Sequence, residues 1–233
     1  MTYFQHIICI LSCLTLGACS QFSSSEISHG VATSDPYHGE CGEIVSSTTG
    51  MKITMAKQAF IHGQYYSSLA TLEQVEDNLI TKLALQASAH RKAGQWEEAK
   101  DLYQELLSSC LKGNAAHGLG LIAAYQGKYL LSRDWLEIAI KAEPANANIR
   151  NDYGFLLLSL GQEKQARTQL VTALELSPDN QTAAKNLWLV LRRGSEEQAA
   201  LSLQRRFSWT PQESNKLAVA AARLNPLSTL ENQ

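Results

Sequence analysis

The chain has 233 residues, of which 45% are hydrophobic and 18% are charged, and its formal net charge is −2. This length is enough for one sizeable domain or two small ones, and the hydrophobic fraction is enough to form a buried core. The near-neutral charge argues against a nucleic-acid-binding protein, which normally carries a strong basic excess. Only 5 prolines are present, and the long proline-free stretches favour helices.

The N-terminus contains an uncharged apolar run at residues 7–16. About ten residues span roughly 15 Å as a helix, which is well short of the ~30 Å core of a bilayer. The run therefore predicts the hydrophobic region of a signal peptide covering residues 1–18, rather than a membrane-spanning helix. The alternative is a buried apolar helix or strand of a cytosolic protein, because the residues before the run include no Lys or Arg.

The apolar run ends in Leu16-Gly17-Ala18-Cys19, which resembles the lipobox of bacterial lipoproteins. The resemblance implies that the signal is cut before Cys19 and that this cysteine becomes the acylated first residue. The next residue is Ser20 and not an aspartate, which in lipoproteins of enterobacterial type implies sorting to the outer membrane. We therefore expect a lipid-anchored protein on the periplasmic face of the outer membrane.

Two cysteines remain beyond the signal and the lipobox, Cys41 and Cys110. An oxidising periplasm permits a disulfide between them. The alternative is two unpaired thiols, because sequence spacing does not show whether the two Cα atoms approach within bonding range.

The composition changes sharply at residues 20–50, which hold eight Ser and four Gly but no Lys or Arg. Such a stretch cannot bury enough apolar surface to offset the entropy lost on ordering. Together with the acylated cysteine, residues 19–50 are therefore expected to form a flexible tether. A chain of this length has a root-mean-square reach of roughly 30 Å.

From residue 51 onward a repeat appears, marked by the nearly regular recurrence of the glycines Gly63, Gly94, Gly127 and Gly161. The first three glycines are followed two positions later by an aromatic residue. Small residues lie seven positions before and five positions after each glycine, so two antiparallel helices joined at the glycine can cross closely. These small residues are Ala56, Ala87, Gly120 and Gly154 before the glycine, and Ser68, Ala99, Ser132 and Ala166 after it.

The period and its glycines resemble the tetratricopeptide repeat, a helix-turn-helix unit of about 34 residues. The resemblance implies an all-α fold, a right-handed α-solenoid of about four repeats plus an eroded fifth, over residues 51–206. In the fifth, at residues 182–206, Trp188 replaces a small residue. Residues 207–233 are expected to supply a capping helix and a tail, because a stack of repeats must cover its last apolar face.

The chain carries no motif of enzymatic chemistry. Its six His residues form no His-x-x-x-His pair, and no two Cys beyond the predicted signal peptide have the spacing of metal ligands. The Gly127-Lys128 pair has no second glycine five positions earlier and is interpreted as a turn between helices, not as a phosphate-binding loop. We therefore expect no enzymatic activity, no cofactor and no metal.

In tetratricopeptide arrays the first helix of each pair lines a concave groove. Mapping by distance from each turn glycine predicts a groove with an apolar floor and cationic margins, suited to an amphipathic or extended peptide with acidic flanks. The alternative is that the apolar members are core between adjacent helices and the arginines are solvated surface, since a shift of one helical position exchanges the faces. The predicted groove residues are Asn114, His117, Leu121, Tyr125, Asn148, Asn151, Phe155, Leu158, Lys185, Leu189, Arg192 and Arg193, flanked by Arg91 and Lys92.

The combination of a lipobox, a Ser-rich tether, about four repeats and a capping helix resembles the TadD family of lipoproteins from tight-adherence (Flp) pilus assembly. The stretch from Pro144 to Leu158 carries the resemblance most closely. It implies a pilotin-like role, with an outer-membrane secretin subunit or another pilus assembly component as the partner. The alternatives are a general outer-membrane scaffold for envelope or cell-wall machinery, and the pilotin of type IV pili, which is also a tetratricopeptide lipoprotein.

Overall fold

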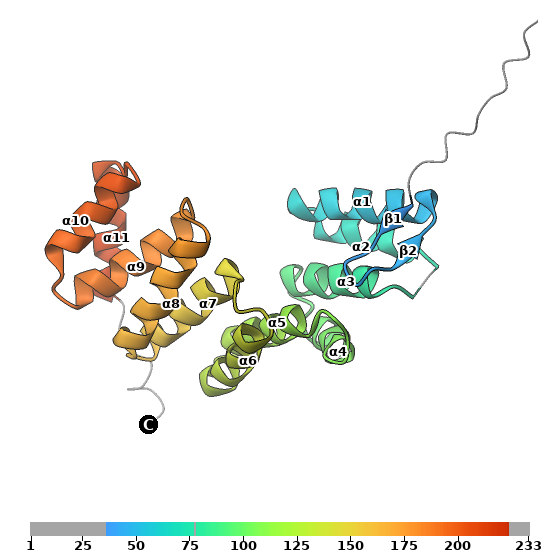
Figure 1. Ribbon diagram of the computed structural model, residues 1–233, viewed down its shortest axis with the longest axis horizontal. Coiled ribbons are helices and arrows are strands. Elements are labelled where there is room, and N and C mark those ends of the chain that lie inside the picture. The colour runs from blue at the N-terminus through green and yellow to red at the C-terminus, as the bar shows by residue number, and fades with distance from the viewer. Residues whose placement is uncertain (1–35, 77, 224–233) are drawn as a thin grey trace, which may run out of the picture. The chain divides into compact units, whose positions relative to one another are not determined.

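The computed structural model describes residues 36–76 and 78–223, which form a short antiparallel hairpin followed by helices α1 to α11 (Figure 1). In the hairpin, Tyr37 pairs with Val45 and His38 pairs with Ile44. The elements are β1 (Tyr37–His38), β2 (Ile44–Val45), α1 (Ser47–Ile61), α2 (Tyr65–Glu73), α3 (Ile80–Lys92), α4 (Trp96–Leu106), α5 (Lys112–Tyr125), α6 (Tyr129–Ala142), α7 (Ala147–Ser159), α8 (Glu163–Leu176), α9 (Gln181–Arg193), α10 (Glu197–Arg206) and α11 (Pro211–Arg223).

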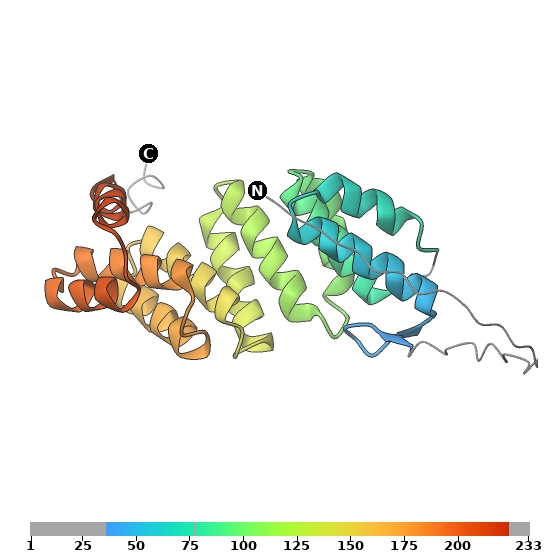
Figure 2. The same ribbon diagram turned by 90° about the horizontal axis from the view of Figure 1, so that it is seen from above.

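The helices form consecutive antiparallel pairs, α1 with α2 through α9 with α10, and each pair packs against the next (Figure 2). The four turn glycines have φ values between +74° and +80°, a conformation that only glycine adopts without strain. The sequence therefore encodes where each pair reverses. The prediction of an all-α solenoid of helix-turn-helix units is confirmed.

Close helix crossing depends on the small residues that flank each turn. Ala56, Ala87, Ala99 and Ala166 are fully buried. A Cβ placed on Gly154 would lie 2.7 Å from Cγ of Leu170, closer than real side-chain contacts allow. The α7–α8 crossing is thus tight enough to require a glycine, and the equivalent Gly120 meets Leu136 in the same way.

The C-terminal end of the stack is closed by α11, at the place where a capping helix is expected. Leu217 and Ala221 of α11 pack onto the core formed by α6 to α10. Trp209, just before α11, is buried and donates a hydrogen bond from Nε1 to Gln181 Oε1 at 2.8 Å. These contacts cover the apolar face that the last repeat pair would otherwise expose. The predicted tail at residues 224–233 lies outside the described residues.

The fifth repeat keeps the turn but lacks its glycine. Ser195 occupies the position equivalent to Gly161 of the preceding repeat and has a φ of +58°, a left-handed conformation that is unfavourable for a residue with a side chain. Replacing Ser195 by Gly should raise the free energy of unfolding by about 0.5–1 kcal/mol. Urea denaturation would measure the change. The control is Ser202→Gly inside α10, which should instead destabilise by about 0.5 kcal/mol; a loss in both variants would contradict the argument.

The prediction that residues 19–50 form a flexible tether is wrong for residues 36–50. Residues 37–45, called the strap below, form the hairpin, and α1 begins at Ser47 with Ser46 as its N-cap. The strap is ordered because long-range contacts hold it: the ring of Tyr37 lies against Gly50, and Cys41 is bonded to Cys110. The signal peptide, Cys19 and the first part of the tether lie outside the described residues.

The structure places Cys41 and Cys110 in a disulfide with a Cα–Cα distance of 5.8 Å. Cys110 lies between α4 and α5, so the bond joins the strap to the second repeat pair. Of the two alternatives left open by the sequence, the structure contains the disulfide and not two free thiols. Among the described residues, no helix is both long and apolar enough to cross a membrane.

Candidate functional site

A pocket of about 390 Å³ opens between α5, α6 and α7. It lies where α5 and α7 approach each other less closely than the first helices of the neighbouring pairs do. Because α5 and α7 are not in close contact here, side chains of both helices face the solvent-filled pocket between them. The pocket is lined by Leu121, Ala124, Tyr125, Tyr129, Ser132, Leu136, Asp152, Phe155, Leu156 and Ser159.

The helical period brings the apolar members of the pocket together. Leu121 and Tyr125 are one helical turn apart on α5 and therefore share a face, and Phe155 approaches from α7. Tyr125 is 68% exposed and Phe155 is 41% exposed, which is unusual for large aromatic side chains. These residues can bury further apolar surface only against a partner.

An aromatic stack extends the pocket toward α4. The ring of Trp96 lies 5.9 Å from that of Tyr125, with an angle of 21° between their planes. Trp96 also occupies the aromatic position that follows the second turn glycine, so the repeat itself positions it. Trp96, Tyr125 and Phe155 thus form a partly exposed aromatic strip, of the kind that supplies the anchors of protein interfaces.

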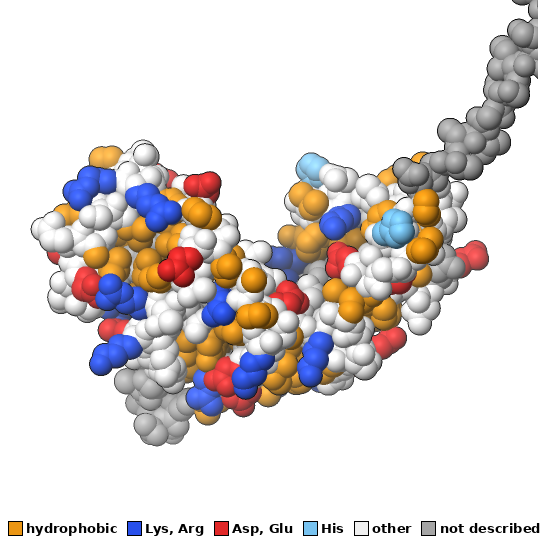
Figure 3. Space-filling model, viewed as in Figure 1, with side chains coloured by type: hydrophobic (Ala, Val, Ile, Leu, Met, Phe, Trp, Pro, Cys, Tyr) orange, Lys and Arg blue, Asp and Glu red, His pale blue; other side chains and the backbone are white. Residues whose placement is uncertain are grey.

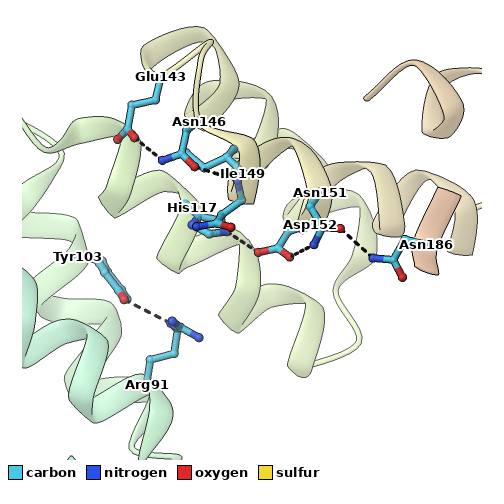
Figure 4. Close-up of polar contacts among 10 residues, drawn as sticks. Arg91, Tyr103, His117, Glu143, Asn146, Ile149, Asn151, Asp152 and Asn186 are labelled. Carbon is cyan, nitrogen blue, oxygen red and sulfur yellow. Dashed lines mark hydrogen bonds and ion pairs between the residues drawn. The ribbon is translucent and has the colours of Figure 1, made fainter. Parts of the chain in front are cut away.

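A chain of polar contacts runs beside the pocket from α5 to α9 (Figure 4). His117 Nε2 lies 2.7 Å from Asp152 Oδ2, and Asn151 Nδ2 donates to Asp152 Oδ1 at 3.0 Å. Asn186 Nδ2 in turn donates to Asn151 Oδ1 at 2.9 Å. The chain holds Asp152 at the pocket wall, where it is the charged residue among those that line it.

Three predicted groove residues, Leu121, Tyr125 and Phe155, are brought together in this pocket. His117 does not line the pocket and is the partner of Asp152, which does. Asn148 is exposed in the first turn of α7, and its backbone N–H is capped by the side chain of Asn146. The apolar floor is thus narrower than the mapping predicted.

The prediction is wrong for Leu158, Leu189 and Asn151. Leu158 is fully buried and Leu189 is 6% exposed, both within the core that joins α7 to α9. Asn151 is 6% exposed, and its side chain is hydrogen-bonded to those of Asp152 and Asn186. Adjacent first helices must pack against each other, and these residues lie on the faces in contact. The alternative of core between helices is correct for them.

The predicted cationic margin is also wrong at its C-terminal end. Arg192 pairs with Glu197 and lies over the ring of Trp188, 5.6 Å from its centroid. Arg193 Nε lies 2.8 Å from Glu163 Oε1. Both arginines therefore hold the last repeat pairs together and do not form a free basic rim.

Lys185 is partly buried on α9, and its charge acts on Glu213 of the capping helix. Hydrogen bonds from Thr210 lower the pKa of Glu213, and the charge of Lys185 adds to that lowering. Lys185 therefore interacts with the cap of the stack. It does not reach the pocket.

Sequence reasoning missed Asp152 and Tyr129 as pocket residues. Asp152 is adjacent to the predicted Asn151, so an error of one position in helix phase exchanged a buried amide for a partly exposed carboxylate. In the sequence, Tyr129 stands out only as the aromatic residue that follows Gly127 in the repeat pattern.

On the face drawn in Figure 3, both signs of charge are interspersed with hydrophobic side chains. Within the ranges that the structure describes, no group of His, Cys, Asp and Glu is arranged to hold a metal.

The stacked helix pairs and the exposed pocket on their first helices define a helical-repeat protein that binds other proteins. No family model matches the chain. It is 30% identical over 167 residues to the TPR repeat-containing protein PA4299 of Pseudomonas aeruginosa, covering 71% of this chain and 68% of that protein. The chain therefore belongs to the tetratricopeptide-repeat proteins.

Solved structures of MamA share the fold. The MamA fragment from Desulfovibrio magneticus RS-1 is 18% identical with a TM-score of 0.52, and the match covers 70% of this chain and 94% of that one. A second MamA crystal structure is 14% identical with a TM-score of 0.54, covering 69% of this chain and 96% of that one. At these identities the similarity concerns the fold alone.

Proposed function

We propose that this chain is a lipid-anchored, periplasm-facing scaffold that acts as a pilotin-like assembly factor for the outer-membrane secretin of a tight-adherence pilus. The observation that carries the binding role is the pocket, where Leu121, Tyr125 and Phe155 expose apolar surface beside Asp152. The anchor rests on the lipobox ending at Cys19, and the pilus role rests on the resemblance to the TadD family.

The residues that line the pocket indicate the chemistry of the peptide segment that it would bind. Its wall is mainly apolar, and its charge comes from Asp152, whose Oδ2 faces His117. A peptide segment with a bulky apolar side chain next to a backbone or side-chain N–H donor fits this arrangement. The acidic flanks expected from the sequence are not required here, because Arg192 and Arg193 are paired within the chain.

A disulfide fits the proposed location. Cys41 and Cys110 are bonded, and disulfides persist in oxidising compartments such as the bacterial periplasm. The strap that carries Cys41 begins at Tyr37, so residues 37–50 are not part of the proposed tether.

Replacing Cys19 by Ser tests the anchor. If the cysteine is acylated, the variant should leave the outer-membrane fraction, because several acyl chains anchor a protein nearly permanently and their loss removes that affinity. Secretin multimers and surface pili should fall as in a strain that lacks the whole chain. Normal processing and outer-membrane location of the variant would contradict the lipobox. Normal secretin multimers and pili in the deletion strain would contradict the pilotin role and favour a general envelope scaffold.

A further inference from the structure

The strap lies against a second cavity of the groove, separate from the pocket described above. This cavity has a volume of about 210 Å³ and is walled by first helices α1, α3 and α5 and by Glu40 of the strap. Its apolar floor includes Ile53 and Phe60 of α1. One wall of a groove cavity is therefore supplied by the segment that leads into the repeats and not by a repeat.

Two carboxylates attach the strap to the groove. Glu43 accepts hydrogen bonds from the backbone N–H and the hydroxyl of Thr81, at 2.9 Å and 3.0 Å. Glu40 donates its backbone N–H to Thr81 Oγ1 at 2.6 Å, and its carboxylate lies 3.7 Å from Lys57 Nζ. Burial raises the pKa of Glu43, but the hydrogen bonds from Thr81 and Cys41 outweigh it and leave the pKa below its ordinary value. Thr81 of the groove thus helps to stabilise the Glu43 carboxylate in its charged form.

The strap has little stability of its own. Its two strands are very short, and an isolated two-stranded hairpin is marginal in water. Beyond the acidic contacts and the packing of Tyr37 on Gly50, the strap is held by the disulfide from Cys41 to Cys110, at a sequence separation of 69. Cutting this bond leaves mainly side-chain contacts to keep the strap in place.

One wall group of the cavity lacks a partner. Asn114 of α5 lines the cavity, and its Oδ1 atom is buried with no hydrogen-bond partner among the described residues. A buried acceptor without a donor is costly. A backbone N–H of a bound segment would satisfy it, and Lys57 and Thr81 would hold the carboxylates of that segment.

We propose that this cavity, together with Lys57 and Thr81 beside the strap, is a second binding site of the groove for acidic peptide segments. The strap occupies the part of the site formed by Lys57 and Thr81, leaves the cavity itself open, and is locked in place by the Cys41–Cys110 disulfide. The proposal rests on the proposed function in that the groove binds protein segments. Opening requires a dithiol reductant: one of its thiolates attacks Cys110, which is exposed, and Cys41 leaves. The second thiol resolves the mixed disulfide, so two electrons and two protons pass to the cysteines and the reductant becomes a disulfide.

The test uses a fluorescent peptide with the strap sequence from Tyr37 to Ile44, carrying Ser in place of Cys41. Anisotropy would compare its binding to the full chain with the disulfide intact and to the double variant C41S/C110S. We expect at least ten-fold tighter binding to the double variant, because its own strap no longer holds the site. In the double variant, the backbone amide of Thr81 should exchange hydrogen at least ten-fold faster, since it loses the Glu43 carboxylate.

The controls distinguish specific binding at this site from non-specific binding to a chain destabilised by loss of the disulfide. A peptide with Gln in place of both glutamates should not bind, and Lys57→Ala in the C41S/C110S background should weaken binding, whereas Lys141→Ala on α6 should not. Reducing the unaltered chain with a dithiol gives a second way to release the strap if the cysteine variant folds poorly, and the reduced chain should bind the peptide more tightly than the oxidised chain does.

Equal binding to the locked and unlocked chains, or no binding to either, would overturn the proposal. So would unchanged exchange at Thr81 in C41S/C110S. None of these results affects the pocket between α5 and α7, which is tested by variants of Phe155 and Leu121. Failure of this proposal is therefore distinguishable from failure of the proposed function.

Discussion

Replacing Phe155 and Leu121 together by alanine is expected to abolish binding of the partner at the pocket between α5 and α7. Two large apolar side chains would lose their contact with the partner, and at roughly 25 cal/mol per Å² their combined contribution is about 3 kcal/mol. That corresponds to a loss of more than a hundred-fold in affinity. Titration of the purified variant with the proposed partner, a secretin subunit, would measure it.

The matched control is the double variant Leu131→Ala and Leu176→Ala, which removes two exposed apolar side chains from the second helices α6 and α8. It should leave affinity unchanged. Reversing Arg192 and Arg193 to Glu is a poor control, because both arginines are paired within the chain and the reversal would set like charges against Glu197 and Glu163.

The same pocket variant should act in the cell. Under the proposed function, secretin multimers and surface pili should fall while the variant protein stays folded and keeps the location of the unaltered chain. Circular dichroism of the purified variant must show unchanged helix content, since lost helix would report damage to the core. Normal multimers and pili with a folded variant would show that the partner does not bind at this pocket.

Replacing Leu158 by alanine should lower the free energy of unfolding by about 2–5 kcal/mol, the usual cost of truncating a buried leucine. Leu158 is fully buried in the core that joins α7 to α9. Phe155, nearly one helical turn earlier, is 41% exposed, so Phe155→Ala should cost about 1 kcal/mol or less. Urea denaturation followed by circular dichroism compares the two variants.

This pair of variants distinguishes groove from core on a single helix. If Leu158→Ala were as well tolerated as Phe155→Ala and weakened partner binding instead, Leu158 would belong to the groove, as the sequence predicted. Equal and large losses of stability would show that Phe155 is a core residue and would remove it from the binding surface.

The sequence by itself determined the helix pairs and their turns. Gly63, Gly94, Gly127 and Gly161 recur at the period of a helix-turn-helix unit, and the need for positive φ and for close crossing dictates those residue types locally. Such requirements act within a single repeat unit of the chain. For this reason the fold class and the capping helix could be predicted without coordinates.

The groove was only partly predictable, because helix phase decides which side chain faces solvent. Asn151 and Asp152 are neighbours in sequence, yet one is buried and the other lines the pocket. Leu158 and Phe155 lie within one turn of the same helix, and the packing of α7 against α9 covers only the first of them. The sequence pattern within one helix does not give the angle at which it packs against the next helix. It therefore cannot decide which side chains are buried and which face solvent.

Only the tertiary structure determines that the strap is ordered. Residues 37–45 have the composition of a flexible tether, and their order depends on groups far along the chain: Thr81, which binds Glu43, and Cys110, which is bonded to Cys41. No local propensity encodes such contacts, because each requires the repeats to be folded before the partner atoms are close. Long-range contacts therefore convert a segment that would be disordered by itself into one wall of the groove.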